Sequence, residues 1–399
     1  MSFDLLIQNA HVIDPAQNWD GPAEVGVSSG KVAQFGPKLD PTGCPDVRDA
    51  RGLYLCPGLI DLHGHWYEAG LFGINAEIGL NHGVTTAVDA GTAGFANFPD
   101  FRRTVMDRSR ANVLGFVHVS FMGLHAAFAG ELANLVYARP VETAAVIERH
   151  RDRAVGVKVR IGEMMTADHG DAALEIALQA AEMARVPLMV HISKGANERE
   201  ILDRLRPGDI LTHCFHGRSN RIFTGDTEGL IPQLKLARER GVWFDIGHGC
   251  GSFSWESAQK AFEHHFYPDT ISTDLHRYCV GDPFCLTLPV VMSKFLCLGM
   301  SLPDVIFKTT LAPARALSRD GQIGHLRPGA QADMLLFEVR NGEFQFLDTH
   351  LRNQKGTQLI EPRLVIRNGI PYEPGAFPVE LRELYECDKF VFDFVKSSA

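Results

Sequence analysis

The sequence lacks several features that mark particular classes of protein. No uninterrupted apolar stretch reaches the roughly 18 residues of a transmembrane helix, and the first residues have neither the basic region nor the apolar run of a secretion signal. Long basic runs are also missing, and the 399 residues carry a formal net charge of −9. We therefore expect a cytoplasmic protein that binds neither nucleic acid nor a membrane.

Closely spaced cysteines are absent as well. The eight cysteines are scattered along the chain without a Cys-x-x-Cys motif, so we interpret them as reduced thiols rather than as a disulfide framework. A chain of this length needs no such cross-links, because it can bury a sizeable hydrophobic core. Its length fits one large domain with a smaller partner domain.

The most informative stretch is a mostly apolar run, residues 53–62, that leads into two histidines, His63 and His65. Alternate side chains of a strand point to the same side, so both imidazoles face one way. Two imidazoles that converge from the end of a strand make half of a metal site. The pair alone is weak evidence, because packing also produces it, and the rest of the chain decides its meaning.

From Pro57 onwards, short apolar runs alternate with longer amphipathic segments, for example at 171–185 and 230–240. Strands that alternate with helices over roughly 260 residues predict an α/β fold, a (β/α)8 TIM barrel, with a doubly wound open sheet as the rival. No Gly-x-Gly-x-x-Gly follows the first strand, so a dinucleotide role is not indicated. The predicted strands are 59–63, 85–89, 113–119, 154–159, 188–191, 210–213, 242–246 and 270–274.

Both ends of the chain carry short strand patterns and turns without helical periodicity. The turn at 28–31, between two apolar runs, indicates a hairpin. We predict one small β-sandwich domain built from residues 1–56 and 323–373, with the barrel, residues 57–322, inserted between them. Residues 374–399, with aromatic side chains at 390–394, form a C-terminal tail that packs on a neighbouring subunit of a homo-oligomer or is loosely held.

Residues that bind metals close several of the predicted strands. In barrels of this kind the chemistry lies at the C-terminal ends of the strands. A single histidine there is commonly a structural hydrogen-bonding group and a single aspartate commonly caps a helix. Six such residues at one rim are hard to explain by packing alone, so we predict a metal site made of His63, His65, Lys158, His191, His213 and Asp274.

Lys158 needs its own explanation, because an ammonium group has no lone pair for a metal. Near cations the pKa of the lysine must fall from about 10.4. The neutral amine can then take up carbon dioxide and become a carbamate, an anion whose two oxygens can bridge two metals. The alternative is a buried ion pair of Lys158 with Asp274 or Glu163.

The six residues, in this order, resemble the metal-binding set of the binuclear branch of the amidohydrolase superfamily. The segment 57–63 and the split β-domain are also similar, and the resemblance covers nearly the whole chain. Segments 83–91, 212–215, 245–249 and 272–276 resemble the dihydroorotase-like amidohydrolase/deacetylase subgroup in particular.

The resemblance implies a role for each ligand. His63, His65 and Asp274 would hold the more buried of two divalent metal ions. His191 and His213 would hold the more exposed one, and N6-carboxylysine at Lys158 would bridge the two together with a hydroxide. Zinc suits an imidazole and oxygen ligand set, and manganese and iron are the alternatives.

The expected reaction is attack of this hydroxide on an amide, imide or ester carbonyl, with Asp274 passing the proton to the leaving group. We predict that His248 stabilises an oxyanion or, alternatively, is a hydrogen-bonding group of its loop. Arg160 shares a strand face with Lys158 and would bind a substrate carboxylate, unless it pairs with Asp89 or Glu163. His276 would line the pocket or cap a helix.

The resulting prediction is a metal-dependent hydrolase of a small acylated carboxylate, either an N-acyl amino acid or an acetylated hydroxy acid. The alternatives are a cyclic amidohydrolase of the dihydroorotase or hydantoinase type, a deaminase, or a barrel without activity that serves as an assembly partner. Because such inactive barrels usually lack metal ligands, the complete set of six disfavours the last. Loops 121–125 and 277–280 match no motif of the family, so the resemblance does not identify the substrate.

Overall fold

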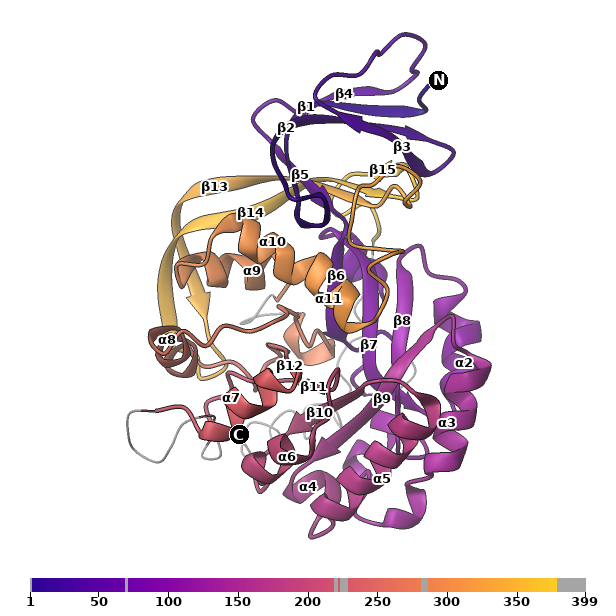
Figure 1. Ribbon diagram of the computed structural model, residues 1–399, viewed down its shortest axis with the longest axis vertical. Helices are drawn as coiled ribbons and strands as arrows, with labels where there is room; N and C mark the ends of the chain where they lie inside the picture. Colours follow the sequence, from indigo (N-terminus) through magenta and orange to yellow (C-terminus); the bar gives the residue numbers. More distant parts are fainter. Residues whose placement is uncertain (1, 69–70, 219–221, 223–228, 281–285, 379–399) are drawn as a thin grey trace.

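The larger part of the fold is a parallel sheet of seven strands, β6 to β12, which neighbour one another in chain order (Figure 1). The computed structural model describes residues 2–68, 71–218, 222, 229–280 and 286–378. The strands of this sheet are β6 (Leu59–Gly64), β7 (Val84–Gly94), β8 (Asn112–His118), β9 (Ala154–Ile161), β10 (Leu188–Ile192), β11 (Ile210–Leu211) and β12 (Trp243–Phe244).

Seven of the eight predicted strands are therefore present in this parallel sheet. The eighth, 270–274, is no named strand, but isolated parallel bridges join Asp245 to Thr270 and Gly64 to Leu275. The amide of Asp274 also donates to the carbonyl of His63 at 2.6 Å. The segment 270–275 thus connects the last strand of the sheet, β12, with the first, β6.

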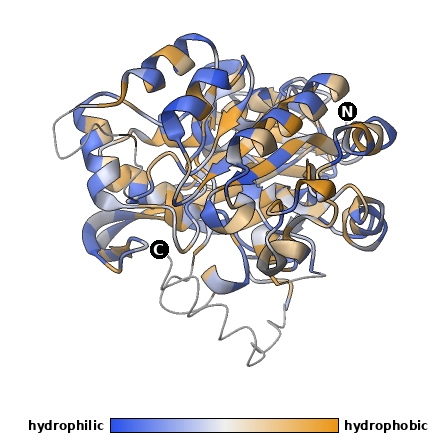
Figure 2. Cartoon of the chain, turned by 90° about the horizontal axis from the view of Figure 1, so that it is seen from below, coloured by the Kyte–Doolittle hydropathy of each residue, from blue (hydrophilic) through white to orange (hydrophobic). Residues whose placement is uncertain are grey.

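Helices follow most of the strands of this sheet. Figure 2 shows apolar strands in the interior and hydrophilic faces on the surrounding helices. In α5 the buried side chains recur at helical spacing from Ala173 to Ala184, which gives one apolar face toward the sheet, and Arg185, with a φ of 54°, ends the helix. The helices are α1 (Glu77–Leu80), α2 (Phe98–Phe101), α3 (Pro140–Arg149), α4 (Glu163–Thr166), α5 (Gly170–Ala184), α6 (Glu198–Arg204), α7 (Pro232–Glu239), α8 (Trp255–Glu263), α9 (Leu288–Cys297), α10 (Leu302–Thr309) and α11 (Leu311–Ala316).

The strands from the two chain ends form a second sheet, in the order β15-β14-β13-β5-β1-β2-β3, with β4 beside β1. β5 joins the halves, because it pairs with β1 on one side and with β13 on the other. The predicted hairpin at 28–31 connects β2 and β3. The strands are β1 (Leu5–Asp14), β2 (Trp19–Ser28), β3 (Lys31–Gly36), β4 (Val47–Asp49), β5 (Tyr54–Pro57), β13 (Met334–Leu347), β14 (Asn353–Arg367) and β15 (Ile370–Tyr372).

The predicted β-sandwich is corrected by this strand order, because the strands form one sheet where a sandwich has two. The side chains of both chain ends share one buried cluster, which includes Val27, Val32, Met334 and Ile366. A bridge between Lys31 and Gln331 also links the outer strand β3 to the chain just before β13. The hydrogen bonds of β5 therefore make one sheet that curves around a single core, where we predicted two stacked sheets.

The beginning of the predicted tail packs against the parallel-sheet part of the chain. The backbone of Phe377 exchanges two hydrogen bonds with the side chain of Asn81, at 2.8 and 3.0 Å, and the guanidinium of Arg110 lies over its ring. Residues 379–399, with the aromatic side chains at 390–394, lie outside the described residues. Among the described helices, none combines the length and the apolar character that crossing a membrane requires.

Candidate metal centre

Three of the predicted ligands converge at one point. Nε2 of His65 lies 3.0 Å from Oδ1 of Asp274, and Nε2 of His63 lies 3.3 Å from the same oxygen. All three side chains are buried, and their ligand atoms lie within 4.8 Å of one another. Burial lowers the pKa of His65 to about 3, so its ring is neutral and has a lone pair for a metal. This geometry fits one metal ion held by His63, His65 and Asp274.

His191 and His213 form a second pair of imidazoles beside the first group. Nε2 of His213 lies 2.7 Å from Nδ1 of His191, and the rings of His213 and His63 are 5.0 Å apart. Nδ1 of His213 donates to the carbonyl of Gly247 at 2.7 Å, which leaves its Nε2 as the lone-pair atom. Burial and the neighbouring His213 keep the pKa of His191 well below its usual range. Two neutral imidazoles therefore face a common point, as a second metal would require.

Lys158 lies among these groups without a partner. Its side chain is 1% exposed, and Nζ makes no hydrogen bond with any described residue. The predicted alternative, an ion pair with Asp274 or Glu163, is not formed. Burial lowers the pKa of Lys158 to about 7, so a large share of the amine is neutral near neutral pH. A buried polar group without a partner is rare, and its presence here points to a bound group.

A layer of hydroxyl groups fixes the histidine tautomers. Thr212 donates to Asp245 at 2.8 Å, so its oxygen accepts from Nδ1 of His63, also at 2.8 Å. This leaves Nε2 of His63 unprotonated toward Asp274. Nδ1 of His65 contacts the hydroxyl of Thr92 at 2.8 Å in a similar way. Thr212, Asp245 and Thr92 were not among the predicted site residues, although Thr212 directly precedes His213 in the sequence.

The carboxylate of Asp61 contacts mainly the backbone of the site. It accepts from the amide of Thr273 at 3.0 Å, from the hydroxyl of Thr273 at 2.6 Å and from the amide of His63 at 3.4 Å. It thereby ties the residue before Asp274 to the strand that carries His63. Burial raises the pKa of Asp61 to about 7 despite these bonds.

Two of the ligands have an unusual backbone conformation. His213 has a φ of 64° and Asp274 a φ of 49°, both in the left-handed region. Such residues are uncommon outside glycine and occur frequently at functional sites. β11 ends at Leu211, two residues before His213. Both side chains lie beside His63, with the rings of His213 and His63 5.0 Å apart and Nε2 of His63 3.3 Å from Oδ1 of Asp274.

Arg160 forms an ion pair that we did not predict. Its Nη1 lies 3.2 Å from Oε1 of Glu131, and Oε2 of the same carboxylate lies 2.9 Å from Nε2 of His118. Glu131 and His118 are fully buried, and His118 stands opposite Lys158 in the register of β8 and β9. The sequence pointed to Asp89 or Glu163 as the partner, because a residue in the loop after η3 (Gly123–Ala129) shows no pattern that locates it.

The ring of His248 has a neighbour on each nitrogen. Nδ1 donates to the carbonyl of Gly249 at 2.8 Å, and Nε2 lies 2.7 Å from Nζ of Lys294 on α9. The ring also stacks on Phe253, with centroids 4.6 Å apart. These contacts tie His248 to Lys294, and its role toward an oxyanion stays a prediction.

His276 lies beside two thiols. Its Nε2 is 3.1 Å from Sγ of Cys279 and 3.8 Å from Sγ of Cys250, so these three form a second group of metal-type donors. Nδ1 of His276 accepts from the amide of Tyr278 at 3.3 Å, where it caps the short helix η5 (Arg277–Cys279). The predicted capping role is therefore present, and a contact with substrate stays a prediction.

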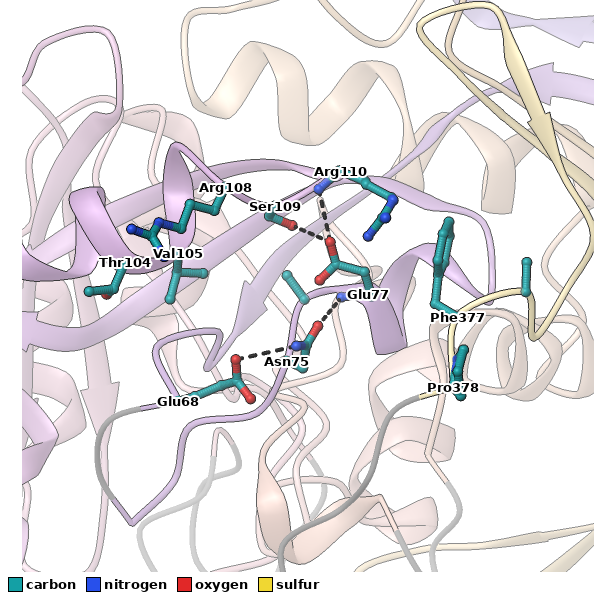
Figure 3. A pocket seen from close by; sticks show the side chains of 12 residues that line it. Glu68, Asn75, Glu77, Thr104, Val105, Arg108, Ser109, Arg110, Phe377 and Pro378 are labelled. Atoms are coloured by element: carbon teal, nitrogen blue, oxygen red, sulfur yellow. Dashed lines mark hydrogen bonds between the residues drawn. The ribbon is translucent and has the colours of Figure 1, made fainter.

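A cavity of about 550 Å³ lies elsewhere, where the start of the tail meets α1 (Figure 3). The carboxylate of Glu77 accepts there from the hydroxyl of Ser109 and the amide of Arg110. Phe377 and Pro378 line the same cavity. None of its lining residues is a predicted site residue, so it contributes nothing to the metal centre.

The chain matches the family model described as "Amidohydrolase family" over residues 54–370. A deacetylase of Agrobacterium fabrum is 32% identical over 343 residues, which cover 84% of this chain and 83% of that protein. A deacetylase of Enterococcus faecalis is 32% identical over 94% of this chain and 100% of its own length.

Two solved structures are similar over nearly the whole chain. The crystal structure of an adenine deaminase superposes with a TM-score of 0.87 at 31% identity, covering 93% of this chain and 100% of the other. The crystal structure of a dihydroorotase gives 0.85 at 29% identity, covering 92% and 99%. With the match of the family model and the converging ligands, these likenesses show that the chain belongs to the amidohydrolase family of metal-dependent hydrolases.

Proposed function

We propose that this amidohydrolase cleaves the amide or ester bond of a small acylated carboxylate, either an N-acyl amino acid or an acetylated hydroxy acid. Relatives named deacetylase, 32% identical over 84% and 94% of the chain, support this class of reaction. A second candidate is a ring-opening or deaminating amidohydrolase. It is favoured by the two similar structures, whose names are dihydroorotase and adenine deaminase.

The observation that carries the metal-dependent chemistry of this proposal is the buried amine of Lys158, which has no hydrogen-bond partner among the described residues. A neutral amine can add carbon dioxide, with loss of one proton, to give N6-carboxylysine. The carbamate is an anion with two oxygens, and it would remove the cost of an isolated buried polar group by binding metal. The pKa of about 7 makes the reactive neutral form available without a catalyst.

The donor set fits two divalent ions, for which zinc is expected. His63, His65 and Asp274 would hold one ion, His191 and His213 the other, and carboxylated Lys158 would lie between them. Bound metal would supply an acidified water as nucleophile and would polarise the scissile carbonyl. Both functions are required by hydrolysis of an amide or an ester.

The side chains around the metals have separate tasks. The carboxylate of Asp274 would accept a proton and return it to the leaving group. Thr212 and Asp245 hold the lone pair of His63 toward the site, and His248 is retained as a candidate for oxyanion stabilisation.

The architecture supports the same conclusion. We interpret the seven parallel strands and the segment 270–275 as a (β/α)8 barrel with short seventh and eighth strands. Within this interpretation the barrel spans residues 57–322, the small β-domain residues 1–56 and 323–373, and the tail residues 374–399. A cytoplasmic homo-oligomer acting on a small molecule remains our prediction for the assembled enzyme.

A substrate screen with zinc-loaded protein tests the proposal. The panel contains N-acetyl amino acids, acetylated hydroxy acids, dihydroorotate, hydantoins and adenine. We expect turnover of an acylated carboxylate, with kcat/KM above that for every cyclic compound and for adenine. Preferential ring opening or ammonia release would overturn the proposal in favour of the second candidate.

A further inference from the structure

Arg218 is a second arginine close to the metal centre. It follows β11 by a short loop, and its Nη1 donates to the carbonyl of Ile192 at 3.2 Å. Its Nη2 lies 3.5 Å from the position that a Cβ on Gly251 would occupy. In the part of the chain that the structure describes, no carboxylate forms an ion pair with it. Among the described residues, its guanidinium thus donates to a neutral carbonyl oxygen and to no carboxylate.

The position of this guanidinium relates it to the site. Nη1 of Arg218 reaches the carbonyl of Ile192 on the strand that carries His191, and Arg160 stands opposite His191 in the register of β9 and β10. Arg160 is compensated by Glu131 at 3.2 Å, whereas no carboxylate among the described residues lies within ion-pair distance of Arg218. Ile192, whose carbonyl holds Arg218, directly follows His191 on β10. Arg160 is therefore already paired with a carboxylate, whereas the guanidinium of Arg218 can still pair with an anionic ligand.

An enclosed cation without a counter-charge is unfavourable, because the protein replaces water with a less polar environment. Burial accordingly lowers the pKa of Arg218, and the charge of Arg160 lowers it further. A bound anion would offset both effects. The planar guanidinium is suited to this, since it can donate two parallel hydrogen bonds to one carboxylate.

We infer that Arg218 binds the carboxylate of the substrate and that Arg160, held by Glu131, does not. The inference rests on the proposed function, because it names the residue that binds the carboxylate group, the part of an acylated carboxylate that is not hydrolysed. Arg218 would be a specificity-determining residue. The enzyme would then select acids over the corresponding neutral amides, whatever the acyl group.

A pair of neutral and charged substrates tests this. The best acid of the screen is compared with its primary carboxamide, which has the same scissile bond and no charge. For the wild-type enzyme we expect kcat/KM to favour the acid. Arg218→Met should lower kcat/KM for the acid by about 10- to 100-fold, mainly through KM, and should leave the amide unchanged. Arg199→Met, at an exposed arginine of α6, is the matched control and should change neither.

A binding measurement separates this inference from the proposed function. Benzoate and benzamide are titrated calorimetrically into zinc-loaded wild type and Arg218→Met, and the uncharged, polar Arg218→Gln replaces the methionine variant if the latter does not fold. Benzoate should bind more tightly than benzamide only when position 218 is charged. If the preference for benzoate survives in Arg218→Met, the metals or Arg160 bind the anion and the inference is wrong. If the benzoate preference depends on Arg218 as expected but the wild type hydrolyses no acylated carboxylate, only the proposed function is refuted.

Discussion

Nε2 of His65 lies 3.0 Å from Oδ1 of Asp274, although 209 positions separate the two residues in the sequence. The contact exists because the segment 270–275 pairs with β6, as the hydrogen bond from the amide of His65 to the carbonyl of Leu275 shows. The segment that pairs with β6 therefore also carries a predicted metal ligand, Asp274. Changes to this pairing should affect the position of that ligand.

The first prediction concerns the carboxylate that we assign to proton transfer. Asp274→Asn should abolish nearly all turnover, because an amide nitrogen cannot accept the proton and the isosteric side chain preserves the packing. Steady-state kinetics with the best substrate of the screen would measure the loss. Asp168→Asn, at an exposed aspartate, is the control and should behave as wild type. Substantial residual activity of Asp274→Asn, at unchanged metal content, would refute the proton role.

The second prediction concerns the tautomer of His63. Thr212→Val should weaken metal binding by about 10- to 100-fold, because the hydroxyl that accepts from Nδ1 of His63 is lost while the shape is kept. Competition with a chromogenic chelator gives the affinity. Thr212→Ser retains the hydroxyl and should stay close to wild type. Equal affinities for Thr212→Val and wild type would show that Asp245 and Thr212 have no influence on the metal.

The third prediction concerns Gly91, whose φ is 86°. A Cβ there would lie 2.7 Å from Cβ and Cγ of Lys158, so Gly91→Ala should displace this lysine and reduce both metal content and activity. Gly52, with a φ of 80° and no atom within 4 Å of an added Cβ, offers a matched control. Gly52→Ala carries the left-handed strain without the clash, so it should cost about 1 kcal/mol of stability without loss of metal. Full metal content in both variants would contradict the predicted displacement of Lys158.

The fourth prediction concerns pH and the metal-free protein in buffer without carbon dioxide. Burial lowers the pKa of Lys158 from 10.5 to about 7, so between these values the unfolded chain binds more protons than the folded one. The contribution of Lys158 to the free energy of unfolding therefore rises with pH across this window, by at most about 1.4 kcal/mol per pH unit. Lys158→Met removes the titrating group. In urea unfolding from pH 7 to 9, the free energy of unfolding of the wild type should therefore rise relative to that of the variant.

Lys235 provides the control for this experiment, since its side chain is 84% exposed on α7. Lys235→Met should differ from wild type by an amount that does not change with pH. If the difference in free energy of unfolding between wild type and Lys158→Met is also independent of pH, the pKa of the buried amine is not lowered.

The sequence predicted the parts of the fold that depend on local pattern. Apolar runs located seven strands of the parallel sheet, and the helical spacing located α5 and α7 within about two residues. Strands from both chain ends share one sheet and one buried cluster, and the division of the chain into domains stays a prediction. The number of sheets was wrong, because hydrogen bonds between β5 and β13 depend on a contact between distant segments.

For the candidate site, the sequence located residues that end strands and missed those that act through tertiary contacts. Asp274 follows a run of strand-forming residues, so its position was predictable. Its left-handed backbone was not, because no local pattern in the sequence marks a non-glycine residue with a positive φ. Glu131 and Arg218 come from loops, where neither period nor spacing indicates which way a side chain points.

The central claim is that six donors from distant segments hold two metal ions, and metal analysis tests it most directly. The protein is purified without chelator, dialysed exhaustively against metal-free buffer and measured by plasma mass spectrometry. We predict about two equivalents of divalent metal per chain. Less than about one equivalent, in protein that is folded and after supply of zinc and bicarbonate, would contradict the account.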